Sequence, residues 1–159
     1  MADDLDRKDI EILKMLRTDS RTPMGLIGDK LDISKATVSR RVASMEEDGT
    51  ITKYSLDIDL STMGVMKSLV MMQIVGSPAT MIIEQLRGYE EIGHIYKTFG
   101  DHNLVCEVYT HNVDELYEMI QTKMLKMPSV RNVEVDILLE GIDMNENADL
   151  KLFEKGIRD

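Results

Sequence analysis

The sequence predicts an α+β protein with an N-terminal winged helix-turn-helix domain and a C-terminal ferredoxin-like βαββαβ domain. Two patterns predict this fold. From Pro23 to Tyr54, two short amphipathic helices separated by a four-residue turn are followed by alternating apolar and polar residues. After Gly64 the order is strand, helix, strand, strand, helix, strand. We expect a first domain at 1–54, a linker strand at 55–65, a second domain at 66–142 and a tail at 143–159.

Length and composition are those of a globular protein. The chain has 159 residues, of which 43% are hydrophobic and 30% charged. No apolar run approaches the roughly 20 residues that span a bilayer, and the start MADDLDRKD lacks a basic-then-apolar secretion signal. One cysteine, Cys106, allows no intrachain disulfide. We therefore expect a cytoplasmic protein with no membrane partner.

The first helix is expected to start at Asp6, a good N-cap residue with Asp9 three positions on, and to end near Arg17. Its apolar residues recur on one side, which predicts their burial. This inner stripe is Ile10, Leu13 and Leu16.

The second and third helices are delimited by turn and cap residues. Pro23 suits the first turn of the second helix, and Asp32 lies at a tight turn that often needs a left-handed main chain. Ser34 is expected to cap the third helix and Gly49 to end it. Alternation over 51–60 predicts a strand that forms the wing. The inward residues of the second helix are Leu26, Ile27 and Leu31.

The third helix combines an apolar side with basic and hydroxyl side chains. Val38, Val42 and Met45 recur at i, i+4 and i+7. The segment from Ser34 to Met45 has three basic residues and no acid, although the chain carries a net charge of −10. Such groups can bond base edges and phosphates in the major groove of double-stranded DNA. The candidate DNA-binding residues are Ser34, Lys35, Thr37, Ser39, Arg40 and Arg41.

Two observations qualify this prediction. The alternative for the candidate DNA-binding residues is that they form a helix face exposed to solvent without touching DNA. The order of elements favours DNA contact. Arg41 borders the apolar stripe, so an ion pair inside the domain is as consistent with its position as DNA contact. Most of the acidic excess lies in residues 61–159, with a net charge of −7 against −3 for residues 1–60. We therefore expect weak non-specific DNA binding by a single subunit.

The second domain is expected to be a four-stranded sheet with both helices on one face. The other face is predicted to be rich in Val, Met and Leu, and a second copy of the chain is its simplest cover. The tail either packs on a neighbour or is partly mobile, and the sequence leaves both open. The expected strands are 67–75, 92–99, 104–110 and 130–139, and the expected helices are 78–87 and 112–126.

Metal-binding and catalytic residues are not expected. His94, His102, His111 and Cys106 are metal-ligating types, but His102 and Cys106 are spaced along a strand, too far apart to share one ion. The sequence holds no evident nucleophile–base pair, phosphate loop or ligand cluster. We expect no catalytic residue, no metal and no cofactor.

Several motifs together resemble the leucine-responsive and asparagine regulator family (Lrp/AsnC). They are Leu5-Asp6-x-x-Asp9-x-x-Ile12-Leu13, Ile33-Ser34-x-x-Thr37-Val38-x-Arg40-Arg41-Val42, Met45-Glu46-x-Asp48-Gly49-x-Ile51 and Gly100-Asp101. The resemblance covers nearly the whole chain, apart from about the last fifteen residues. It implies a transcription regulator whose second domain, of the type called RAM or AsnC, dimerises sheet against sheet. It also implies assembly of dimers into octamers or other multiples.

The family binds an amino acid or related effector between dimers, around a Gly-Asp-x-Asp loop. Here the loop is Gly100-Asp101-His102-Asn103, so an amide replaces the second acid. An Asp could pair with an effector's ammonium group, whereas Asn offers only a carbonyl. The resemblance thus leaves open an ordinary amino acid, a different ligand or none, and Gly-Asp is also ordinary turn chemistry.

Two other functions compete with a sequence-specific DNA-binding regulator. Some tetrapyrrole decarboxylases of the sirohaem type resemble this family in both domains, but such an enzyme has no need of the basic and hydroxyl face of the third helix. An assembly partner that pairs with other family members without binding DNA is compatible with the net charge. We expect a regulator rather than an enzyme.

Overall fold

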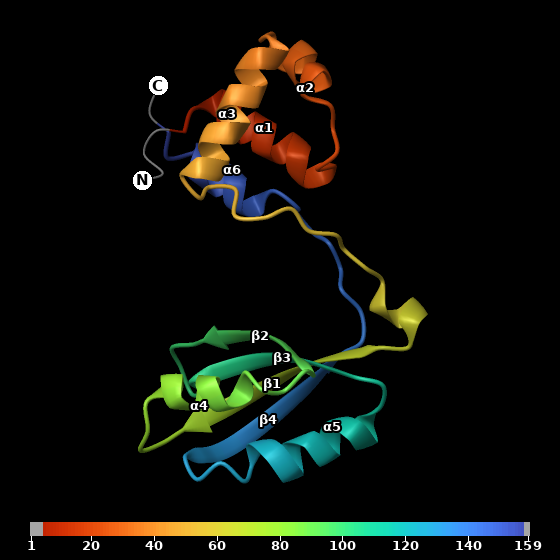
Figure 1. Ribbon diagram of the computed structural model, residues 1–159, viewed down its shortest axis with the longest axis vertical. Helices are drawn as coiled ribbons and strands as arrows, with labels where there is room; N and C mark the ends of the chain where they lie inside the picture. Colours follow the sequence, from red (N-terminus) through yellow and green to blue (C-terminus); the bar gives the residue numbers. More distant parts are fainter. Residues whose placement is uncertain (1–4, 158–159) are drawn as a thin grey trace. The chain divides into compact units, whose positions relative to one another are not determined.

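The computed structural model describes residues 5–157, which form two compact units. The first unit combines the N-terminal residues up to Asp57 with the C-terminal segment from Asp143, and the second unit spans Ile58–Ile142. The chain therefore enters and leaves the second unit through the first. Figure 1 labels the elements of both units.

Three helices form the helix-turn-helix part of the first unit: α1 (Arg7–Thr18), α2 (Met24–Leu31) and α3 (Lys35–Glu47). The start of α1 is confirmed, because Asp6 and Asp9 form a capping box in which each carboxylate accepts the other residue's main-chain N–H at 2.9 Å. Pro23 occupies the N-cap of α2 rather than its first turn. The expected cap of α3 is also confirmed, with Ser34 as its N-cap.

The turn between α2 and α3 depends on one left-handed residue and one glycine. Asp32 has φ 53° and ψ 51°, as the expected left-handed turn requires. The N–H of Ile33 donates to the carbonyl of Gly28 at 3.0 Å. A Cβ on Gly28 would lie 2.5 Å from the Ile33 carbonyl oxygen. The turn can therefore approach α2 only because Gly28 has no side chain.

The apolar core of the first unit joins all three helices. Its buried members are Ile12, Leu16, Ile27, Val38, Val42 and Met45. The apolar side predicted for the third helix is thereby confirmed. Leu26 is 48% exposed, so its expected inward position is wrong. A helix of eight residues presents a narrow inner stripe, and Ile27 occupies it.

The expected wing strand over 51–60 and the expected linker strand over 55–65 are both wrong: the described residues from Ile51 to Val65 contain no strand, and Leu60–Met63 form a short 3-10 helix. The segment turns away from α3 where the Ile51 N–H donates to the Met45 carbonyl at 2.8 Å. Beyond it, Leu56 is 82% exposed and Ile58 57% exposed. Alternating residues form a strand only where a second strand accepts their hydrogen bonds, and none lies beside this segment in residues 5–157.

The second unit has the expected βαββαβ order, with strands in the sheet order β2-β3-β1-β4 and all pairs antiparallel. Both helices pack on one face, against alternate strand residues such as Val70, Met72 and Cys106 (Figure 1). The elements are β1 (Met66–Ile74), α4 (Ala79–Leu86), β2 (Ile92–Lys97), β3 (Leu104–Thr110), α5 (Val113–Met119) and β4 (Val130–Leu138).

The helix expected over 112–126 changes its geometry half-way. After α5 the chain continues as a π-helical turn, Ile120–Met124. The N–H of Leu125 donates to the carbonyl of Ile120 at 2.9 Å, one residue further back than in an α-helix. The wider turn lets both Ile120 and Met124 enter the core.

The second face of the sheet is more polar than expected. Leu69, Met71 and Val105 lie on it, but Lys67 and Glu107 form an ion pair of 3.1 Å beside them. The hydroxyls of Tyr96 and Tyr109 donate to the same Glu107 carboxylate at 3.2 Å each. The β4 residues Val133, Val135 and Ile137 pair with Met72, Val70 and Ser68 and therefore lie on the helix-covered face.

The C-terminal segment contributes a short helix, α6 (Ala148–Glu154), to the first unit. The sequence leaves the partner of this tail undecided, and the structure places α6 beside α1. Arg17 and Lys14 of α1 pair there with Asp149 and Glu154. Within residues 5–157, no helix combines the length and apolar character needed to cross a bilayer.

Candidate functional site

The exposed side of α3 holds the free polar groups of the predicted reading helix. Lys35, Ser39 and Arg40 are exposed, because the opposite side is packed into the core of the first unit. The helix is acidic only at its end, where Glu46, Glu47 and the following Asp48 are exposed. The N-terminal half of α3 is therefore the part that a phosphate backbone would attract.

Ser34 and Thr37 are hydrogen-bonded to each other at the start of α3. The Ser34 hydroxyl accepts the main-chain N–H of Thr37 at 3.1 Å, and the two hydroxyl oxygens lie 2.9 Å apart. Both side chains thereby hold the N-cap of the helix. They lie at the end of α3 that would meet DNA, and their contact with DNA stays a prediction.

Arg41 is held by α1. Its Nη1 donates to Asp6 Oδ2 and to Asp9 Oδ1, both at 2.8 Å. The hydrogen bond to Asp9 outweighs the effect of partial burial and, with the bond to Asp6, raises the pKa of Arg41. Of the two readings of Arg41 that the sequence left open, the structure shows the ion pair inside the domain.

Replacing Arg41 by alanine is expected to destabilise the first unit rather than to alter DNA preference. Asp9 is 6% exposed and would lose its cation, at an expected cost of about 1–2 kcal/mol. Urea unfolding of Arg41→Ala followed by circular dichroism measures this cost. The matched control is Arg40→Ala, which removes a neighbouring exposed guanidinium and should leave the unfolding midpoint unchanged. Equal midpoints for the two variants would contradict the structural role of Arg41.

Three small residues on the exposed side of α3 were missed by reasoning from the sequence. Ala36 and Ala43 lie about one turn before and after Arg40, and Ser44 follows Ala43 one turn after Arg40. Small side chains let a helix approach a groove closely while a long side chain such as Arg40 reaches further in. Their spacings of four and three residues from Arg40 are visible in the sequence. Alanine has no polar group, however, so these residues do not by themselves suggest contact with DNA.

The predicted effector loop is the turn between β2 and β3, and its residues lie together. Thr98 stabilises the turn with two hydrogen bonds. Its main-chain N–H donates to the Asn103 carbonyl at 3.0 Å, and its hydroxyl donates to the His102 carbonyl at 2.6 Å. Asn103 Oδ1 accepts the main-chain N–H of Ile74 at 2.6 Å. The amide carbonyl that would meet an effector is therefore bonded to β1 in this structure.

The neighbours of Asn103 are more open to solvent. Gly100 and Asp101 are exposed. His102 is half-buried, with Nε2 3.4 Å from Glu134 Oε1 on β4. Asp101 is thus the exposed carboxylate in this loop, and Phe99, two residues earlier, is fully exposed.

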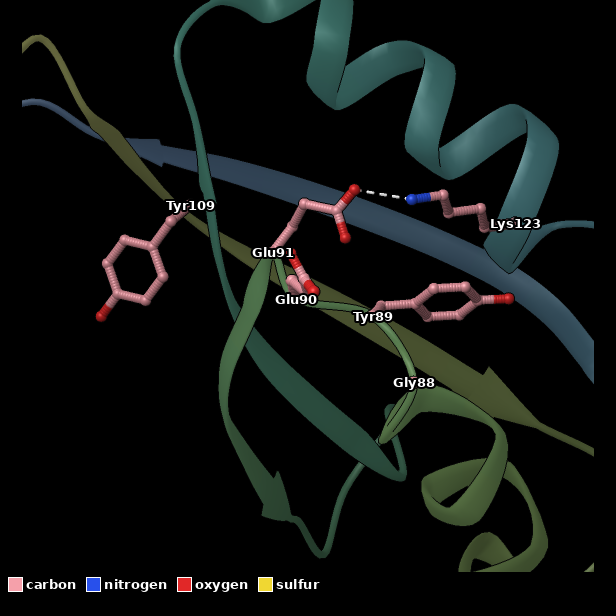
Figure 2. A pocket seen from close by; sticks show the side chains of 6 residues that line it. All are labelled: Gly88, Tyr89, Glu90, Glu91, Tyr109 and Lys123. Carbon is pink, nitrogen blue, oxygen red and sulfur yellow. Dashed lines mark hydrogen bonds and ion pairs between the residues drawn. The ribbon is translucent and has the colours of Figure 1, made fainter.

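A surface hollow of about 500 Å³ lies elsewhere in the second unit (Figure 2). Lys123 projects into it from the π-helical turn, with Nζ 2.6 Å from Glu91 Oε1 and 5.0 Å from the centre of the Tyr89 ring. The hydrogen bond from Lys123 lowers the pKa of Glu91. Residues 100–103 do not line this hollow, whose lining is Gly88, Tyr89, Glu90, Glu91, Tyr109 and Lys123.

The sequence could not have revealed this hollow, because its members come from three separate parts of the chain. Gly93 beside it accommodates Tyr109, since a Cβ on Gly93 would lie 2.4 Å from a carbon of the Tyr109 ring. The charge of Lys123 is already balanced by Glu91, so the hollow offers no unpaired cation from that side chain.

The metal-ligating residue types lie apart. Cys106 is buried in the core of the second unit, and burial raises the pKa of its thiol to about 11. His94 packs on Tyr96 with ring centres 4.4 Å apart, and His111 lies 3.2 Å from Glu115. The described part of the chain holds no group of three or more His, Cys, Asp or Glu that could bind a metal ion.

Two family models match the chain. One is described as winged helix-turn-helix DNA-binding and matches residues 5–52; the other is described as Lrp/AsnC ligand binding domain and matches residues 65–147. The HTH-type transcriptional regulator LrpA of Pyrococcus horikoshii is 32% identical over 139 residues, which cover 86% of this chain and 97% of that protein.

Solved structures share the fold. AsnC from E. coli matches with a TM-score of 0.78 at 22% identity, covering 89% of this chain and 96% of that one. Transcriptional regulator NMB0573 from Neisseria meningitidis, solved as a complex with L-Met, matches with a TM-score of 0.78 at 15% identity, covering 88% of this chain and 93% of that one.

Proposed function

Since this chain belongs to the Lrp/AsnC family of DNA-binding transcriptional regulators, we propose that it reads specific DNA sequences through the N-terminal half of α3. Its relatives are transcriptional regulators and not enzymes, which sets aside the tetrapyrrole decarboxylase. The observation that carries the proposal is the charge pattern of α3. Lys35, Ser39 and Arg40 form an exposed cationic and hydroxyl-bearing surface before the first acid of the helix, Glu46.

Within this surface the roles differ. Arg40 lies between two alanines about one turn away, so its guanidinium can reach deepest into a major groove and bond phosphate or base. Lys35 and Ser39 flank it, and Thr37 with Ser34 holds the helix N-terminus. We expect Lys35 and Thr37 to affect sequence preference. Arg41 serves mainly to join α3 to α1.

We further propose that the protein acts as a dimer and as octamers or other multiples of dimers. The uncovered face of its sheet carries Leu69, Met71 and Val105. The linker presents Leu56 and Ile58 with no strand beside it in the described chain. A second copy could cover both features. Two reading helices would then enter successive major grooves about one turn, ~34 Å, apart.

The effector proposal rests on the second unit. The ligand-binding family model spans residues 65–147, and the Neisseria relative was solved with L-Met. We propose that an amino acid or related metabolite binds at the loop of Gly100, Asp101, His102 and Asn103 and shifts the balance among assemblies. An ammonium group would meet Asp101 here, because the Asn103 carbonyl is bonded to Ile74.

Replacing Asn103 by aspartate is expected to create or strengthen a response to an amino acid. One carboxylate oxygen can keep the bond from the Ile74 N–H while the other becomes free for an ammonium group. The test is a thermal-shift and DNA-affinity profile of the variant against the common amino acids. Asp101→Asn is the matched control and should reduce any response. Identical profiles for the wild type and Asn103→Asp would remove the loop from the effector site.

The DNA proposal is tested by selection from random duplexes, followed by fluorescence anisotropy on the selected sequence. We expect enrichment of a two-fold symmetric site and a linear fall of log affinity with log salt concentration. A purified oligomer that enriches no sequence and shifts no duplex at modest ionic strength would contradict the proposal. It would favour an assembly partner that pairs with other regulators without binding DNA.

A further inference from the structure

Helix α6 is attached to α1 by charged side chains. Arg17 binds the Asp149 carboxylate with both terminal nitrogens, at 2.6 Å from Nη1 to Oδ1 and 3.0 Å from Nη2 to Oδ2. Its Nη1 also donates to the Glu146 carbonyl at 3.0 Å. One turn earlier, Lys14 Nζ lies 2.9 Å from Glu154 Oε2. The contact therefore extends along the whole length of α6.

Apolar packing accounts for only part of this contact. No residue of α6 is fully buried: Leu150 is half-buried, Phe153 is 36% exposed and Leu152 is 73% exposed. The Arg17–Asp149 pair lies at the surface, with side chains 35% and 69% exposed, and the Lys14–Glu154 pair is half-buried, with side chains 18% and 33% exposed. An attachment whose hydrogen-bonded groups are ion pairs within reach of solvent is reversible and weakens with salt.

The place of α6 in the chain gives this attachment a consequence. The second unit ends at Ile142, and the ligand-binding family model ends at residue 147, before α6 begins. When α6 is bound to α1, the segment that follows the second unit is attached to the DNA-binding unit. The linker that precedes the second unit already connects the two units. Two tethers leave the DNA-binding unit less freedom of rotation than one.

We propose that α6 is a salt-sensitive strap, fastened by Arg17–Asp149 and Lys14–Glu154, that narrows the range of half-site spacings the oligomer accepts. This inference rests on the proposed function, since it assumes paired reading helices. Restricted rotation pre-organises the two DNA-binding units for one separation, and it penalises DNA in which the half-sites lie further apart or closer together. Opening the strap broadens the choice of sites.

The Arg17–Asp149 pair of the strap is insensitive to pH near neutrality. The hydrogen bond from Arg17 lowers the pKa of Asp149 to about 2. A carboxylate with a lowered pKa contributes its stabilisation above its ordinary pKa and loses it as the pH falls through the lowered value. The Arg17–Asp149 pair therefore stays charged on both sides from about pH 4 through neutrality, and salt rather than pH weakens this pair in that range.

The docking of α6 is tested without DNA by hydrogen exchange on the full-length protein. We expect the amides of residues 148–154 to exchange at least threefold faster in Arg17→Ala and Asp149→Ala than in the wild type at low salt. Lys151→Ala, which alters an exposed charge on the same helix, should exchange like the wild type. Equal exchange in the wild type and Arg17→Ala would overturn the strap.

The spacing role is tested on duplexes that carry two identical half-sites moved apart by single base pairs. For the wild type, affinity should fall steeply when the spacing departs by 2–3 base pairs from its optimum. In Arg17→Ala and Asp149→Ala this fall should shrink at least threefold, while affinity for a single half-site stays within twofold. The exchanged pair, Arg17→Asp with Asp149→Arg, should restore the steep profile.

The outcomes separate the two proposals. An unchanged spacing profile in both single variants would overturn the strap's role while leaving DNA binding intact. A wild type that binds no duplex would overturn the proposed function and the spacing role together, and hydrogen exchange would still decide whether α6 docks on α1.

Discussion

Replacing Arg40 by alanine is expected to weaken binding to every duplex by about ten- to a hundredfold per dimer. Arg40 is exposed in the N-terminal half of α3, with Ala36 and Ala43 about one turn away on either side. Loss of one phosphate contact per subunit should also lower the slope of log affinity against log salt by about one for each contact removed. Fluorescence anisotropy on the selected site, at several salt concentrations, measures both effects.

The matched control for this variant is Arg87→Ala in the second unit. Arg87 is an exposed arginine at the C-cap of α4 that pairs with Glu84, three residues earlier, so its removal changes the net charge equally. If both variants lose affinity to the same extent, the loss reflects overall charge and not a contact from α3. If Arg40→Ala discriminates less between sequences than the wild type, its guanidinium also reads a base.

Replacing Gly28 by alanine is expected to destabilise the DNA-binding unit by about 2–3 kcal/mol and to abolish specific DNA binding. The new Cβ would lie 2.5 Å from the Ile33 carbonyl oxygen, a main-chain atom that can move only if the turn before α3 opens. Thermal unfolding followed by circular dichroism should show a lower first transition. The transition of the second unit should stay unchanged, because Gly28 belongs to the first unit.

Gly25 supplies an internal control in the same helix. A Cβ on Gly25 would meet nothing within 4 Å, and alanine is favoured over glycine in a helix by about 1 kcal/mol. Gly25→Ala should therefore be as stable as the wild type or more so. Equal stability of Gly28→Ala and Gly25→Ala would contradict the close packing of the turn.

Elements whose determinants are local could be predicted from the sequence. The Asp6 cap, the left-handed Asp32 and the Ser34 cap each depend on hydrogen bonds or main-chain preferences within three or four residues. The order of strands and helices in the second unit likewise follows from periodicity. The wing strand over 51–60 failed because a strand also needs a partner, which alternation within one segment does not supply. The π-helical turn after α5 was missed because a helical pattern does not specify how the last turn packs.

The same distinction between local and long-range determinants applies to the candidate site. The exposure of Lys35, Ser39 and Arg40 follows from the buried stripe on the other side of α3. The pairing of Arg41 with Asp6 and Asp9 joins residues more than thirty positions apart, so the sequence could only leave it open. The hollow around Lys123 and the attachment of α6 to α1 depend on contacts between distant segments, and no local sequence pattern predicts such contacts.

The most direct test of the central claim is site-directed cleavage of the selected DNA from α3. A cysteine at Ser39, labelled with iron-EDTA, would place the reagent on the exposed side of the helix. The native Cys106 is buried and its thiol pKa is raised to about 11, so it should remain unlabelled. Ser39→Cys is predicted to cut both half-sites at positions about one turn apart, ~10 base pairs. Cleavage no stronger or more localised than that from a label at exposed Thr80→Cys on α4 would contradict the claim that α3 docks in the major groove.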